Sequence, residues 1–336
     1  MVFLTTWIFN FVLPKRWTNG KSQPEKELSS STESTHADAI VSGNDQSESS
    51  RDLTDLTLNV AKESTYAIAQ GGFGDVWKCR FSDKDHNVEV AVKCVRIEIP
   101  DDHFKEIVNK RLMNDFHKWK PLRHDNIVSL CGITYGFGPV PAIVSPWMPN
   151  GSLSTYLNKR YDTLSEADKI GLLADVAAGL YYLHANEVAH ADLTGSNVLI
   201  DSDGRALLAD YGLLTTCSEL NGTSYIRSNV RWAAPELFEV PETEGVPSSP
   251  KLESDIYSFG CVAYQVLSGR QPYYDIRSDH QVVVAILRGV KPKRPETPVI
   301  QDYHWDFIEK CWLEMSQRPP IAEVRDLMYR YRDAMY

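Results

Sequence analysis

The pattern of apolar and polar residues changes along the chain, from short β-type runs in the first half to helical spacing in the second. Residues 65–70 and 76–81 are predicted to be strands around a glycine turn, and the β-branched run V-E-V-A-V-K-C-V-R-I at 88–97 predicts a third. Residues 100–119 favour a helix, and 127–135 and 142–145 favour two more strands. The pattern breaks at 146–151.

Helical periodicity follows that break. Residues 164–185 form an amphipathic pattern, with Asp162 or Thr163 as the candidate N-cap and one apolar face made by Ile170, Leu173, Ala177, Leu180 and Leu183. Further helices are predicted at 253–268, 280–288, 303–311 and 321–335. The chain therefore predicts an α+β protein of two lobes, and the cleft between them is the usual place for a small-molecule site.

The first 52 residues differ from the rest. Residues 1–13 are apolar, but they are shorter than the roughly 20 residues of a membrane-spanning helix, and no basic start precedes them. We expect a frayed tail or a short hydrophobic docking segment, and membrane contact through residues 1–17 stays open as the less favoured alternative. Residues 19–51 are rich in Ser, Thr, Glu and Asp and are predicted to be disordered. The folded domain is expected at 53–336.

Charge and cysteine content narrow the class of partner and compartment. The net charge is −10 and basic residues do not cluster, which argues against nucleic acid as a partner. The cysteines are scattered, without a C-x-x-C pair: Cys79, Cys94, Cys131, Cys217, Cys261 and Cys311. Buried free thiols in a reducing compartment are predicted, and hence a cytoplasmic protein.

Candidate chemistry lies at 188–199, where His190, Asp192 and Asn197 are spaced H-x-D-x-x-x-x-N, and at the turn D-Y-G that begins with Asp210. Asp192 can accept a proton from a hydroxyl, while Asn197 and Asp210 offer the hard oxygen ligands that Mg²⁺ prefers. H-x-D alone is a common tripeptide and D-Y-G an ordinary turn. Their order, spacing and flanking apolar strands make the combination specific.

These two motifs resemble the catalytic loop and metal-binding turn of the protein kinase family. Other kinase-like motifs follow in order from 68 to 319: I-A-Q-G-G-F-G-D-V, V-A-V-K, V-R-W-A-A-P-E, S-D-I-Y-S-F-G and Q-R-P. The ending V-R-W-A-A-P-E and the loop H-x-D-L-T-G-S-N look closest to the tyrosine-kinase-like serine/threonine group. The resemblance implies the bilobal kinase fold, with a β-rich N-lobe at 53–145, a hinge at 146–150, a helical C-lobe at 151–336 and an ATP cleft between them.

By this resemblance the chain binds ATP and Mg²⁺. Asp192, Lys93, Asn197 and Asp210 take the catalytic positions, and the last two hold the metal. Gly71 and Gly74 lack a Cβ and would let the backbone approach phosphates. The full expected nucleotide site is Ile68, Ala69, Gln70, Gly71, Gly72, Phe73, Gly74, Val76, Ala91, Lys93, Ser145, Pro146, Met148 and Leu199.

Four positions depart from the family pattern. Ala69 stands in the first glycine slot, and Asp115 in the slot of the helix glutamate that pairs with Lys93. That pair could form directly or through water, or Asp115 could be a solvated helix charge. Ala191 replaces an arginine and Thr194 a lysine. We therefore expect modest turnover that does not depend on phosphorylation at Thr215, Thr216, Thr223 or Ser224.

Three further contacts are expected. The ring of Tyr211 should pack near Trp119 and above His190, with its hydroxyl on a polar neighbour. Glu236 should form a buried pair with Arg318, and Asp255 should brace the backbone of the catalytic loop.

The function implied is an ATP-dependent protein kinase that phosphorylates serine or threonine hydroxyls of protein substrates, with tyrosine left open. The first alternative is a weakly active pseudokinase scaffold, for which the four departures argue. The second is a small-molecule phosphotransferase, against which the A-P-E segment at 234–236 and Arg318 argue.

Overall fold

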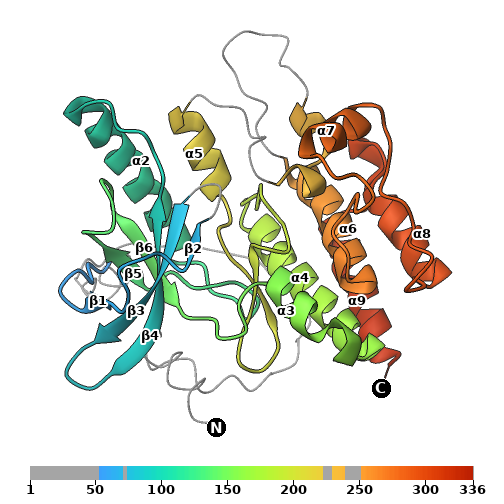
Figure 1. Ribbon diagram of the computed structural model, residues 1–336, viewed down its shortest axis with the longest axis horizontal. Helices are drawn as coiled ribbons and strands as arrows, with labels where there is room; N and C mark the ends of the chain where they lie inside the picture. Colours follow the sequence, from blue (N-terminus) through green and yellow to red (C-terminus); the bar gives the residue numbers. More distant parts are fainter. Residues whose placement is uncertain (1–52, 71–73, 222–228, 239–250, 336) are drawn as a thin grey trace, which may run out of the picture.

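The computed structural model describes residues 53–70, 74–221, 229–238 and 251–335. Strands dominate the first part and helices the second, so the two-lobed α+β layout is confirmed (Figure 1). In order, the strands and α-helices are β1 (Val60–Lys62), β2 (Ala69–Gln70), β3 (Gly74–Ser82), β4 (Asn87–Val95), α2 (Asp102–Trp119), β5 (Gly132–Thr134), β6 (Ala142–Pro146), α3 (Leu153–Arg160), α4 (Glu166–Ala185), β7 (Val198–Ile200), β8 (Ala206–Leu208), α5 (Leu213–Asn221), α6 (Leu252–Ser268), α7 (Asp279–Leu287), α8 (Asp302–Cys311) and α9 (Ile321–Asp333). Short 3₁₀ turns lie at Tyr161–Thr163, Val230–Trp232, Pro235–Phe238 and Met315–Gln317.

The sheet of the first lobe is antiparallel, in the order β1-β3-β4-β6-β5, and β2 pairs with β3. Its register places Val76 opposite Lys93 and Ala91 opposite Ser145. Directly opposed residues point to the same face of a sheet, as do residues two apart on one strand. The register therefore gathers these four side chains on one face, turned toward the helical lobe.

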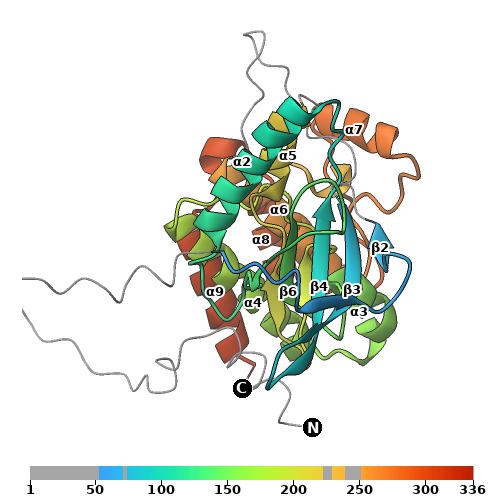
Figure 2. The same ribbon diagram turned by 90° about the vertical axis from the view of Figure 1, so that its left-hand side faces the viewer.

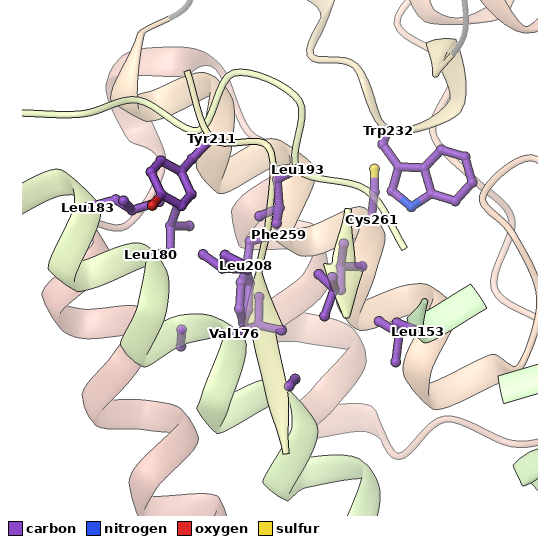
Figure 3. Close-up of a cluster of buried hydrophobic side chains, with 14 of the residues drawn as sticks. Leu153, Val176, Leu180, Leu183, Leu193, Leu208, Tyr211, Trp232, Phe259 and Cys261 are labelled. Carbon is purple, nitrogen blue, oxygen red and sulfur yellow. The ribbon is translucent and has the colours of Figure 1, made fainter. Parts of the chain in front are cut away.

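The second lobe is organised around α4 and α6, whose side chains are largely buried. Leu153, Val176, Leu180, Leu208 and Phe259 belong to one core cluster, and Leu193 of the catalytic loop joins it (Figure 3). The catalytic loop therefore rests on a packed core, which fixes its position relative to the helices.

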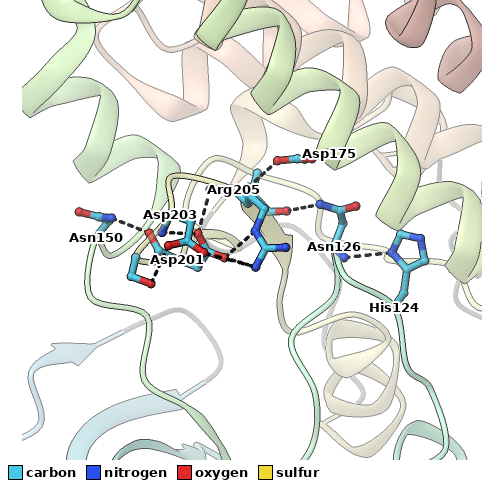
Figure 4. Close-up of polar contacts among 9 residues, drawn as sticks. His124, Asn126, Asn150, Asp175, Asp201, Asp203 and Arg205 are labelled. Carbon is cyan, nitrogen blue, oxygen red and sulfur yellow. Dashed lines mark hydrogen bonds and ion pairs between the residues drawn. The ribbon is translucent and has the colours of Figure 1, made fainter. Parts of the chain in front are cut away.

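The β7–β8 hairpin is tied down by polar contacts (Figure 4). Both oxygens of Asp201 accept from residues of its own turn: Oδ1 from the backbone N–H of Asp203 and of Arg205, and Oδ2 from Arg205 Nε at 3.0 Å. Asn126 Nδ2 donates to the carbonyl of Ala206 at 3.0 Å, at the start of β8. The strand that leads to Asp210 is thus held at its base.

Several predicted boundaries were wrong. Ser165 is the N-cap of α4, and its side chain and that of Asp168 form a capping box, so neither Asp162 nor Thr163 caps that helix. Within 65–70 only Ala69–Gln70 is strand, and within 127–135 only Gly132–Thr134. Helices α3 and α5 were not predicted. Both are under ten residues, too short for periodicity to show clearly.

The structure also gives the state of the cysteines and tests for helices that could span a membrane. All six cysteines are free thiols, as predicted, and five of them are buried. No helix in the described part of the chain has both the length and the apolarity that crossing a membrane requires.

Candidate active site

A cavity of about 470 Å³ lies between the two lobes. Most of the predicted nucleotide-site residues line it: Ile68, Ala69, Gln70, Val76, Ala91, Lys93, Ser145, Pro146, Met148 and Leu199, together with Asn197 and Asp210. Gly71, Gly72 and Phe73 lie outside the described residues. Gly74 is not part of the lining, and a Cβ there would overlap the carbonyl oxygen of Cys94 on β4. The close approach of two strands is therefore a sufficient reason for glycine at 74.

Two opposite charges meet across the cavity. The ammonium of Lys93, on β4 of the first lobe, forms an ion pair with Oδ2 of Asp210, which follows β8 of the second. Both side chains are mostly buried, at 15% and 23% exposure. Asp210 has a φ of +63°, a left-handed conformation that non-glycine residues adopt rarely and that costs free energy. The carboxylate that pairs with Lys93 is thus carried on a strained backbone.

Asp192 and Asn197 are joined within one loop. Asn197 Nδ2 donates to Oδ2 of Asp192 at 2.7 Å and to its carbonyl oxygen at 2.8 Å. Burial raises the pKa of Asp192 to about 7, although hydrogen bonds from Asn229 and Asn197 oppose that rise. A carboxylate with a pKa near neutrality can accept a proton and give it up again.

The backbone of this loop is braced as predicted. Asp255, at the start of α6, accepts from the N–H of His190 at 2.8 Å and from the N–H of Ala191 at 2.9 Å. Its Oδ2 also lies 2.9 Å from Nε2 of His184. Ala191 has a φ of +70°, so the loop is held in a strained turn just before Asp192.

Comparison with known proteins agrees with this geometry. Residues 63–328 match the family described as protein tyrosine and serine/threonine kinase. The chain belongs to this family.

Two similar proteins have names that describe them as protein kinases. The chain is 26% identical over 304 residues to "Serine/threonine-protein kinase STY46" of Arabidopsis thaliana, covering 90% of this chain and 48% of that protein. It is 28% identical over 276 residues to "Mitogen-activated protein kinase kinase kinase 3" of Homo sapiens, covering 80% and 41%. The chain thus spans less than half the length of these relatives.

Two further contacts expected from the sequence are confirmed. Arg318 donates to Glu236 through two nitrogens, Nη1 to Oε1 at 2.6 Å and Nη2 to Oε2 at 2.9 Å. The rings of Trp119 and Tyr211 meet edge to face with centroids 6.2 Å apart. The Tyr211 hydroxyl donates to the carbonyl of Val128 at 3.2 Å. These contacts fix the two ends of the segment between Asp210 and Glu236.

Asp115 departs from two of the expectations stated for it, the direct pair with Lys93 and the solvated helix charge. It is neither solvated nor paired with Lys93 in the structure: its exposure is 5%, and Oδ2 accepts from Thr216 Oγ1 at 2.8 Å and from Arg111 Nε at 3.0 Å. Thr216 belongs to α5, which the sequence did not predict. Figures 1 and 2 show α5 lying beside α2, and Arg111 also forms an ion pair with Glu219 of α5. The carboxylate of Asp115 therefore holds α5 against α2.

The donor set suits Mg²⁺ bound together with phosphates. In the described residues no group of three or more His, Cys, Asp and Glu side chains gathers into a metal site of its own. Asp210 offers a carboxylate, and Asn197, whose Nδ2 is turned to Asp192, keeps its Oδ1 for another partner. Mg²⁺ is commonly held by one or two protein oxygens, with substrate phosphates and waters completing the shell, so these residues fit it.

Sequence reasoning missed two polar residues of the site. Thr216 was named only as a candidate phosphorylation site, and its contact with Asp115 was missed because it becomes buried only when α5 forms. Asn229 donates through Nδ2 to both carboxylate oxygens of Asp192, at 3.1 Å each. It stands five residues before Ala234 of the A-P-E segment, and that fixed distance was the available signal.

Proposed function

We propose that this chain is an ATP-dependent protein kinase that transfers the γ-phosphoryl group of Mg-ATP to serine or threonine hydroxyls of protein substrates. One observation carries the proposal. Lys93 of one lobe and Asp210 of the other pair at a cavity of nucleotide size, beside the hydrogen-bonded Asp192 and Asn197. Phosphoryl transfer asks the protein mainly to position groups and neutralise charge, and this arrangement provides both.

Nucleotide binding falls to the first lobe and the segment after β6. Val76, Ala91 and Leu199 would enclose the adenine, and Ser145 would leave room at the back of the cavity. Lys93 would hold the α- and β-phosphates with its ammonium while it stays near Asp210. These assignments explain why apolar walls and one buried cation share a single cavity.

Asn197 and Asp210 are the residues that would hold Mg²⁺. When bound, the ion neutralises charge on the phosphates and fixes their geometry. Asp192 orients the acceptor hydroxyl and takes its proton as the new ester forms, which its raised pKa permits near neutral pH. Thr194, where a lysine would add charge, gives no such help, so turnover is expected to be modest.

Serine and threonine are the proposed acceptors because the name of one relative, "Serine/threonine-protein kinase STY46", states that class. A cytoplasmic location is part of the proposal, since ATP is available there and reduced thiols persist. Protein substrates and ATP are the proposed partners.

The test is transfer of ³²P from Mg-[γ-³²P]ATP to a degenerate library of serine, threonine and tyrosine peptides, followed by identification of the labelled amino acid. The full chain and an Asp192→Asn variant are assayed side by side. We expect label on serine and threonine with the wild-type chain alone. Equal signals from the two proteins would refute catalysis and favour a scaffold role.

A further inference from the structure

Positive charge gathers where α2 ends. Lys118, Lys120 and Arg123 lie within six positions of one another, in the last turn of the helix and just past it. Lys118 is 62% exposed and pairs with Asp115 at 3.3 Å. In the described part of the chain neither Lys120 nor Arg123 forms an ion pair, although Asp125 lies exposed two residues further on. The surface formed by 118–123 therefore carries two half-buried cations without an anionic partner.

The two unpaired cations lie close together. Lys120 Nζ donates to the carbonyl of Cys131 at 2.7 Å, and Arg123 Nη1 donates to the carbonyl of Leu122 at 2.7 Å. Burial lowers the pKa of Lys120, and the neighbouring charge of Arg123 lowers it further. Carbonyl oxygens accept some of the available hydrogens but carry no full charge. An anion at this surface would therefore relieve the repulsion between the two side chains.

The described part of the chain begins beside this surface. The N–H of Ile133 donates to the carbonyl of Thr54 at 2.9 Å, and the two segments run parallel here. Because paired parallel segments advance together, Leu53 comes level with Cys131, whose carbonyl accepts from Lys120. The residues that precede 53 are therefore joined to the fold next to Lys120.

Those preceding residues carry the opposite charge. Between 25 and 52 the sequence has seven acidic residues and two basic ones. Asp45, Glu48 and Asp52 fall within the last eight positions, with Arg51 as the one base among them. Glu48 is five residues from Leu53, and five extended residues span at most about 17 Å. Its carboxylate is therefore within reach of the two unpaired cations without a second molecule.

We propose that the acidic segment 45–52 docks on the surface formed by Lys118, Lys120 and Arg123, and so ties the N-terminal part of the chain to the C-terminal end of α2. The inference goes beyond the proposed kinase activity and does not depend on it. A single exposed ion pair is weak. Attachment at residue 53 makes the contact intramolecular, and tethering of this kind gives effective concentrations in the millimolar range. Half-buried cations are also screened less by salt than exposed ones.

The test compares the full chain with two variants that each remove three negative charges. The test variant neutralises the docking segment: Asp45→Asn, Glu48→Gln and Asp52→Asn. The matched control neutralises acids farther from residue 53: Glu25→Gln, Glu27→Gln and Glu33→Gln. Crosslinking with a carbodiimide joins a carboxylate to a lysine amine only where the two groups touch, and mass spectrometry identifies the joined residues. Deuterium exchange at 116–123 measures the protection of the end of α2.

We expect crosslinks within one chain from Lys118 or Lys120 to Asp45 or Glu48, in wild type and in the control variant. Amide exchange at 116–123 should be about three- to tenfold faster in the test variant alone. Raising the salt concentration from about 0.05 to 0.5 M should speed exchange in wild type toward that of the test variant, and this comparison needs no substitution.

Three outcomes would overturn the inference. The first is equal exchange in all three proteins together with no effect of salt on wild type. The second is a set of crosslinks spread evenly over distant exposed lysines such as Lys159 and Lys310. The third is crosslinks that join two chains only, because the occupant of the surface would then be a second copy and not the segment of the same chain.

Discussion

The hydrogen bond between Thr216 and Asp115 is one of the contacts that hold α5 to α2, and it can be removed with one substitution. Thr216→Val keeps the shape of the side chain and deletes the hydroxyl that donates to Asp115 at 2.8 Å. Both residues are buried, with exposures of 2% and 5%. The substitution therefore leaves a charged oxygen short of one buried donor.

The size of the loss follows from burial. A buried hydrogen bond to a charged group contributes about 2 kcal/mol, so Thr216→Val should lower the free energy of unfolding by that amount. Asp115→Ala also loses the pairs with Arg111 and Lys118, whose side chains are 37% and 62% exposed. Solvent screening limits those pairs to a few tenths of a kcal/mol each, which brings the total for Asp115→Ala to about 3 kcal/mol.

Urea unfolding of the two single variants and the double variant gives the coupling free energy between the side chains. We expect about 1 to 2 kcal/mol of coupling. Thr163→Val is the control, because its hydroxyl donates to Arg160 at an exposed site and should matter by less than about 0.5 kcal/mol. Zero coupling, with Thr216→Val as stable as wild type, would refute the contact.

Asp115→Glu should lower the free energy of unfolding by about 1 to 3 kcal/mol, because the longer side chain overpacks a buried position. A rise in kcat at unchanged stability would show instead that residue 115 reaches Lys93.

Three further outcomes are expected. Glu236→Gln leaves the buried guanidinium of Arg318 without its charge partner, so the free energy of unfolding in urea should fall by about 3 kcal/mol. A fall of less than about 1 kcal/mol would contradict the buried pair. Burial opposes the charged form of Glu236, but the hydrogen bond and charge of Arg318 outweigh it and lower the pKa. The stability from this pair is therefore present above about pH 4.5 and lost as the pH falls through the lower folded pKa, so Glu236→Gln should flatten the wild-type decline in acid. Tyr211→Phe removes the donor to Val128 and should cost about 1 kcal/mol, measured in the same way; no change would argue against that hydrogen bond.

Much of the site was predictable because it is encoded by local spacing. His190, Asp192 and Asn197 lie within one tight loop. The turn at Asp210 follows β8, which pairs with β7, the strand that comes directly after that loop. The pair of Glu236 and Arg318 spans 82 positions, yet each residue stands in a motif of its own. Such contacts follow from sequence because the motif fixes the backbone that carries them.

The rest depended on how distant segments pack. The partner of Asp115 could not be read from α2 alone, since it is supplied by α5, a short helix whose burial stabilises it more than its propensity does. The contact of Asn229 with Asp192 joins residues 37 apart and depends on the anchoring of Arg231. The N-cap of α4 was misplaced because Thr163 and Ser165 are both good caps, and the capping box with Asp168 decides between them.

The central claim is that Lys93, Asp192, Asn197 and Asp210 gather around the phosphates of one magnesium-bound nucleotide. The most direct measurement is calorimetric titration of ATP with and without Mg²⁺ into wild type, Asp210→Asn and the control Asp203→Asn, whose carboxylate lies exposed in the β7–β8 turn. We predict that Mg²⁺ strengthens ATP binding at least about tenfold in wild type and in Asp203→Asn and hardly at all in Asp210→Asn. Equal dependence on Mg²⁺ in all three proteins would contradict the account.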